Sequence, residues 1–169
     1  MNIYFTYNDE LSRSAFLIEQ LIRNNSDIRI CVLEKNADLV INLDFTHSTG
    51  KNTLHCVLYD RDELKKNIAV NIANACRDRN IPFDFAKIDN RISTPEKSTL
   101  YVKFGRQNYE FDQAAWTASV AEGIISGIAG TEYKVDPIDE YKKPVAQKTY
   151  WERNFAQEPT RNSDLFKAQ

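Results

Sequence analysis

The sequence predicts an α/β domain, a mostly parallel sheet flanked by helices, followed by an extended irregular C-terminal arm. Short apolar segments alternate with segments of helical periodicity up to residue 130, which favours parallel strands with helices on both faces of the sheet. All five glycines lie at or before position 130, and no sustained periodicity follows. With 42% hydrophobic residues, the chain can build about one domain with a core. We therefore expect an α/β domain at 1–130 and an extended arm at 131–169.

The expected strands are short runs of apolar and β-branched residues. The run DLVINL at 38–43 is almost continuously apolar, which is typical of a strand buried on both faces. The run at 27–33 alternates, the run at 99–104 is also typical of a buried strand, and the segment at 82–89 is the weakest. The expected strands occupy residues 2–6, 27–33, 38–43, 53–59, 82–89 and 99–104.

Three segments, at 9–25, 61–80 and 111–130, have the apolar spacing of helices. Asp9 is the expected N-cap of the first, and Gly130 is the expected residue just after the last. In the third segment the apolar stripe consists of Trp116, Val120, Ile124 and Ile128.

Charge and composition exclude several classes of partner. The formal net charge is −2 and the basic residues are scattered, so we expect no nucleic-acid partner. The first residues show no secretory signal, and no stretch is long enough for a membrane span. We expect synthesis in the cytoplasm, with incorporation into a particle as one further destination. Cys31, Cys56 and Cys76 are expected to be small buried hydrophobes rather than a disulfide framework.

The segment 131–169 combines prolines with aromatic residues. Prolines interrupt regular structure, whereas a solvated disordered tail is usually poor in aromatics. The arm can wrap over its own domain or order on a neighbouring subunit, and the sequence leaves both possibilities open. Its candidate docking anchors are Tyr141, Tyr150, Trp151, Phe155 and Phe166.

Four segments follow one another in an order that resembles the zinc-dependent N-acetylmuramoyl-L-alanine amidases of the Amidase_3 type. Glu10 opens ELSRSAFLIEQLI, as a metal-binding Glu does in that family. ADLVINLDFT is similar to ADLxISIHAN, and TLHCVLYDRDELKKNIAVNIANAC is similar to a strand with an SxxLAxxI helix. LYVKFG, with the Ala-, Ile- and Gly-rich helix after it, is similar to VEVGF and its helix. The resemblance covers residues 2–130 and implies an α/β fold and peptidoglycan amide cleavage.

The resemblance also implies a degenerate site. A catalytic zinc takes three protein ligands, and a separate carboxylate acts as general base. Glu10 keeps one ligand position, but Asp44 stands at the position of the SIHAN histidine and Lys103 at that of the catalytic Glu. The first loop, FTYNDE, has no histidine. An ammonium cannot accept a proton from water and repels a metal ion, so we expect no catalytic residue, no metal and no cofactor.

Two alternatives keep the same residues in other roles. His47, three residues beyond Asp44, would complete a variant zinc site with Glu10 and Asp44. Without metal, Lys103 between the two carboxylates would form an ion cluster. His55 is expected to be a strand residue packed at a sheet face.

No other enzymatic motif is present. The sequence contains no GxSxG elbow, no GxGxxG and no Walker loop, and STGKN lacks the leading glycine of a phosphate loop. We expect a catalytically inactive, amidase-like structural or interaction module within a larger assembly of protein subunits. A bacteriophage virion, in its tail or baseplate, is the setting suggested by analogy with cell-wall lysis. The alternatives are a zinc-dependent peptidoglycan amidase with altered ligands and a wall binder that has lost cleavage.

Overall fold

The structure is a computed structural model that describes residues 1–46, 54–58, 62–87, 98–105 and 113–134. Every described element belongs to a unit that spans Met1–Val135. The anchors expected in the arm, from Tyr141 to Phe166, lie outside the described residues. The boundary at 130 between the two expected parts therefore stays a prediction.

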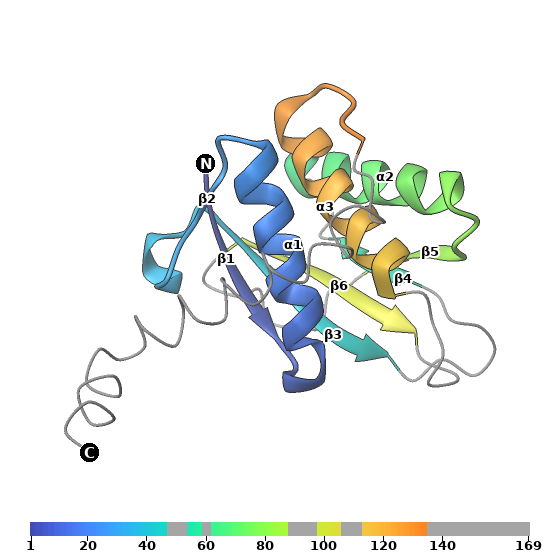
Figure 1. The fold of residues 1–169 in the computed structure, drawn as a ribbon, viewed down its shortest axis with the longest axis horizontal. Coiled ribbons are helices and arrows are strands. Elements are labelled where there is room, and N and C mark those ends of the chain that lie inside the picture. Colours follow the sequence, from blue (N-terminus) through green and yellow to red (C-terminus); the bar gives the residue numbers. More distant parts are fainter. Residues whose placement is uncertain (47–53, 59–61, 88–97, 106–112, 135–169) are drawn as a thin grey trace, which may run out of the picture. The chain divides into compact units, whose positions relative to one another are not determined.

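The centre of the fold is a six-stranded sheet in the order β2-β1-β3-β6-β4-β5 (Figure 1). Strands β1, β2, β3 and β6 run parallel, while β4 is antiparallel to β6 and parallel to β5. The expected mostly parallel α/β fold is confirmed, with β4 and β5 running opposite to the other four strands. The strand bounds are β1 Asn2–Tyr7, β2 Arg29–Ile30, β3 Leu39–Thr46, β4 Leu54–Leu58, β5 Phe83–Lys87 and β6 Thr99–Gly105.

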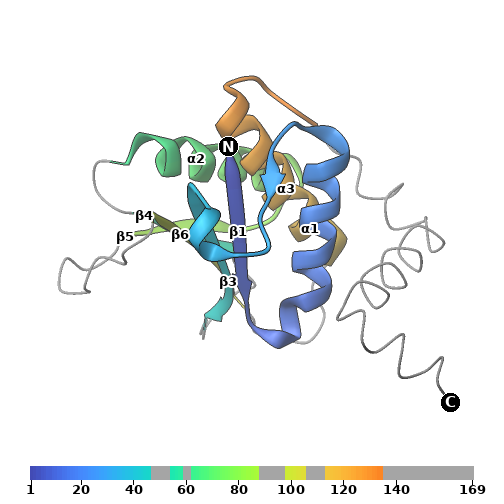
Figure 2. The same ribbon diagram turned by 90° about the vertical axis from the view of Figure 1, so that its left-hand side faces the viewer.

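The helices α1 (Ser12–Asn25), α2 (Glu63–Asp78) and α3 (Gln113–Ala129) lie together on one face of the sheet (Figures 1 and 2). The expectation of helices on both faces is therefore wrong for the described elements. The reason lies in the two crossovers β1-α1-β2 and β4-α2-β5. The first crossover leads toward the β2 edge of the sheet and the second toward the β5 edge, and β4 runs opposite to β1. A half-turn rotation about the sheet normal therefore relates the two crossovers. Right-handed crossovers related in this way place both helices on the same face.

Helix α3 lies between α1 and α2 and is buried nearly all round. Of the expected stripe, Trp116, Val120 and Ile124 are buried and Ile128 is partly buried, but residues between them, such as Ala121 and Ile125, are buried as well. The Trp116 ring packs against that of Phe104 with centroids 5.8 Å apart. The periodic stripe therefore underestimates how much of α3 the fold covers.

Two glycines allow α3 to approach α2 closely. A Cβ on Gly123 would lie 2.6 Å from the Cα of Ile72, and a Cβ on Gly127 would lie 2.5 Å from the Cα of Ile68. Real Cβ atoms do not approach backbone atoms so closely, because the interior is already close-packed. The two helices pack backbone to backbone only because these positions lack a side chain.

Several local predictions can be compared with the structure. The side chain of Asn8, not that of Asp9, caps the first helical turn by accepting the Glu10 N–H at 3.0 Å. Gly130 follows α3 with a φ of +71°, as the sequence predicted. The expected strand at 27–33 is paired only over Arg29–Ile30, and Val32 beyond it is 85% exposed.

The cysteines differ in environment. Cys56 and Cys76 are buried, as predicted, whereas Cys31 is only half-buried. Burial raises the pKa of the Cys56 thiol well above its ordinary value and raises that of Cys76 to about 12. Both buried thiols therefore remain protonated and unreactive at neutral pH.

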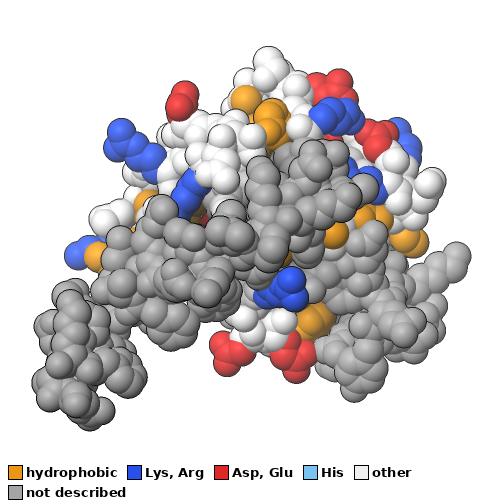
Figure 3. Space-filling view, in the orientation of Figure 1, with side chains coloured by type: hydrophobic (Ala, Val, Ile, Leu, Met, Phe, Trp, Pro, Cys, Tyr) orange, Lys and Arg blue, Asp and Glu red, His pale blue; other side chains and the backbone are white. Residues whose placement is uncertain are grey.

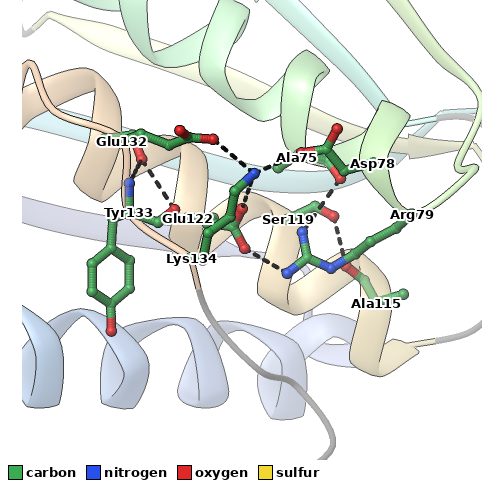
Figure 4. A network of polar contacts seen from close by, with 10 residues as sticks. Ala75, Asp78, Arg79, Ala115, Ser119, Glu122, Glu132, Tyr133 and Lys134 are labelled. Atoms are coloured by element: carbon green, nitrogen blue, oxygen red, sulfur yellow. Dashed lines mark hydrogen bonds and ion pairs between the residues drawn. The ribbon is translucent and has the colours of Figure 1, made fainter.

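Residues 131–134 pack against α2 and α3 (Figure 4). The Tyr133 N–H donates to the Ser126 hydroxyl at 2.9 Å, and its side chain packs against the core. The Lys134 ammonium lies 2.6 Å from Asp78 and 3.8 Å from the buried Glu122. Glu122 also pairs with Arg79 at 2.5 Å. The beginning of the expected arm is thus part of the domain surface.

The surface seen in Figure 3 carries acidic and basic side chains that are interspersed over its described part. Among the described residues, no helix is both long and apolar enough to cross a membrane, in agreement with the sequence prediction.

Candidate functional site

The pleat of the sheet separates an apolar face from a polar one. On the apolar face, Ile3, Ile41 and Val102 belong to the core beneath the helices. Their neighbours along each strand point to the other face, because successive side chains alternate. None of the helices α1, α2 and α3 covers that second face, which we call the open face, although Val40 and Thr99 on it are buried. It carries mainly polar side chains, including Thr6 and Asn42, which are joined by a hydrogen bond of 2.7 Å.

Four ionisable residues lie side by side on the open face. The strand register pairs Asp44 of β3 with Lys103 of β6, Lys103 with His55 of β4, and His55 with Asp84 of β5. Asp44, Lys103 and His55 are half-buried, and Asp84 is exposed. We call these four residues the ionisable row. Three of the four lie on interior strands, where ionisable side chains are unusual, so the row is the candidate site of this domain.

Asn8 connects the first loop to this row. Its backbone N–H donates to the carbonyl of Leu43 at 3.0 Å, and its side-chain amide lies 3.4 Å from Asp44 Oδ1. The same Asp44 oxygen accepts the Phe45 N–H at 2.7 Å. Because Asn8 also caps Glu10, it fixes the loop that carries Glu10 beside the end of β3.

The structure thus brings Asp44 and Lys103 together, as the resemblance implied. Lys103 nevertheless forms no ion pair with Asp44 or Glu10 among the described contacts. The expected three-residue ion cluster is therefore absent from the described part of the chain. Asp44 instead uses one oxygen to accept from the backbone of its own strand.

The described residues do not supply the ligand set of a zinc site. No group of three His, Cys, Asp or Glu side chains in the described ranges is close enough to hold a metal ion. His47, which the variant zinc site requires, lies outside the described residues. The described residues therefore offer Asp44 beside the Lys103 ammonium, and this pair does not supply the three ligands of a catalytic zinc.

Sequence reasoning missed two members of the row. The alternation in TLHCVLY placed His55 and Cys56 on opposite faces, but it did not show which strand lies beside His55. The antiparallel pairing of β4 with β6 makes Lys103 its neighbour. Asp84 lies in the weakest predicted strand, and its pairing with β4 completes the row. Asn8 was missed because Asp9 is an equally good capping residue.

No family model and no curated protein sequence matches the chain. Solved structures do match its fold. The catalytic domain of the CD27L endolysin targeting Clostridia difficile superposes with a TM-score of 0.54 at 14% identity, covering 79% of this chain and 99% of that one. The N-acetylmuramoyl-L-alanine amidase AmiC2 of Nostoc punctiforme gives 0.54 at 11% identity, covering 77% and 96%.

A third similar structure is the catalytic domain of CwlV, an N-acetylmuramoyl-L-alanine amidase from Bacillus (Paenibacillus) polymyxa. It gives a TM-score of 0.51 at 13% identity, with 77% of this chain and 97% of that chain covered. The chain therefore has the α/β fold of N-acetylmuramoyl-L-alanine amidase catalytic domains. At these identities the likeness concerns the fold, and the chemistry has to be argued from the residues.

Proposed function

We propose that this domain is a catalytically inactive, amidase-like module that serves a structural or interaction role in a larger assembly. The observation that carries the proposal is the pairing of Lys103 with Asp44 on adjacent strands of the open face. By the resemblance to Amidase_3-type enzymes, these two positions would carry a metal ligand and the catalytic general base. An ammonium in place of the base cannot take a proton from water.

The electrostatics of the row support the same conclusion. Directly opposite residues on neighbouring strands have Cβ atoms about 5 Å apart. A dication held by Asp44 would therefore lie beside the Lys103 ammonium and be repelled by it. The Asp44 oxygen that accepts the Phe45 N–H is already occupied, which further weakens it as a ligand.

The setting we favour is a virion component such as a tail or baseplate protein, with the aromatic arm docking on partner subunits. The likeness to an endolysin catalytic domain supports a connection with cell-wall lysis. The concentration of aromatics between Tyr141 and Phe166 supports docking, because aromatic side chains dominate interface energetics.

The alternative is a zinc-dependent peptidoglycan amidase with altered ligands, in which His47 joins Glu10 and Asp44. Elemental analysis of protein purified without chelator, together with a peptidoglycan cleavage assay, separates the two. We expect neither zinc nor cleavage in the wild-type chain. One zinc per chain that is lost in Asp44→Ala, accompanied by release of stem peptide, would establish the alternative.

A further inference from the structure

The ionisable row places one basic side chain and one imidazole between two carboxylates. Across the sheet it reads Asp44, Lys103, His55, Asp84, so one carboxylate stands at each end and the cation lies between them. A polyanion would be repelled by both ends. A divalent cation would be repelled by Lys103. The order suits a ligand that itself carries both signs of charge.

The charges in the row are available to such a ligand. Lys103, His55 and Asp84 form no hydrogen bond or ion pair with another described residue through their side chains. Asp44, in contrast, accepts hydrogen bonds from both Phe45 and Asn8 at its Oδ1. Asp84 is therefore the freer carboxylate.

The distance between Lys103 and Asp84 indicates the length of the ligand. Lys103 and Asp84 are separated by one intervening strand, which corresponds to about 10 Å at the usual strand spacing. An extended peptide rises about 3.4 Å per residue, so a tripeptide places its ammonium and carboxylate about 10 Å apart. His55 lies between the two, within reach of a central peptide group.

We propose that the ionisable row binds a short zwitterionic peptide, with the peptide carboxylate on Lys103 and its ammonium on Asp84. The imidazole of His55 then hydrogen-bonds the intervening backbone. This inference goes beyond the proposed module function, since binding requires neither zinc nor cleavage. It can therefore fail while that function holds, and the reverse is also true.

The test is a titration of the full chain with trialanine, followed by the backbone amide resonances of β4 and β6. Two matched probes, N-acetyl-trialanine and trialanine amide, each lack one terminal charge. We expect shifts on these strands and a loss of affinity of about tenfold or more for each blocked probe. Equal binding of all three probes, or no shift on β4 and β6, would overturn the inference.

Variants identify the partners of each charge. Lys103→Met and Asp84→Asn should each weaken trialanine binding about tenfold, and Lys103→Arg should retain it. Lys66→Met serves as the control, because Lys66 is an exposed residue of α2 on the other side of the sheet. Circular dichroism checks that each variant is folded. Unchanged binding in folded Lys103→Met would contradict the assignment, as would a loss in Lys66→Met equal to that in Lys103→Met.

Discussion

At the scale of single residues, Glu122 is a carboxylate buried within the helical layer. Its side chain is 3% exposed and belongs to a helix that is otherwise packed in the core. A buried carboxylate is tolerated only where ionic and hydrogen-bonding partners replace water. Arg79, the residue just after α2, and Lys134, in the segment after α3, provide them (Figure 4). Glu122 therefore ties three parts of the chain together.

Glu122→Gln should lower the free energy of unfolding by about 1–3 kcal/mol, because it keeps the shape but removes the charge that pairs with Arg79. The matched control is Glu132→Gln, which also removes a carboxylate that pairs with Lys134, but from a side chain that is 75% exposed. We expect a loss within about 0.5 kcal/mol for the control. Urea unfolding measures both. Equal losses would show that burial of the Glu122 pair contributes nothing.

At the scale of elements, the contact between α2 and α3 decides whether the helical layer can form. Gly123 and Gly127 are spaced four residues apart, so they lie on one face of α3. That face approaches the backbone of α2 at Ile72 and Ile68. The three helices share one face of the sheet, and this close approach makes room for all of them.

Gly123→Ala should destabilise the domain by about 3 kcal/mol, at the upper end of overpacking costs, although alanine has the better helix propensity. The added Cβ would meet the N and Cα atoms of Ile72 as well as its side chain. Shortening that side chain in the double variant Gly123→Ala/Ile72→Ala should therefore give no rescue. Thermal unfolding tests this, and a double variant more stable than Gly123→Ala would show that only the side chain clashes.

At the scale of the whole molecule, the open face is the sheet surface that α1, α2 and α3 do not cover. The segment up to Lys134 is already held by Ser126, Asp78 and Glu122. A truncation for testing the arm should therefore be made after residue 135, where the first unit ends.

Removal of residues 136–169 should leave the unfolding midpoint of the domain within a few degrees, because the first unit ends at Val135. For a domain of this size, a change of about 1 kcal/mol in the free energy of unfolding shifts the midpoint by about 4 °C. The same truncation should reduce the mass of the assembly measured by light scattering if the aromatic arm docks on a neighbouring subunit. A matched full-length variant, Trp151→Ala with Phe155→Ala, should reproduce that reduction. An arm that packs only on its own domain would instead lower the midpoint and leave the mass per chain unchanged.

The sequence by itself predicted the local elements of this fold and two residues of the row. Apolar periodicity is a local property, so it was sufficient to predict the α/β class, the helices around α1, α2 and α3, and the glycine turn at Gly130. The resemblance also led to Asp44 and Lys103, which the parallel register of β3 and β6 places side by side.

The tertiary structure alone decided the rest. Strand order and direction depend on pairings between segments far apart in the chain, and no local pattern encodes the antiparallel contact of β4 with β6. That contact brings His55 to Lys103, and the reversal it creates places α1 and α2 on the same face. The sequence therefore determined which residues alternate, while non-local pairing decided which of them meet and which face of the sheet α1, α2 and α3 cover.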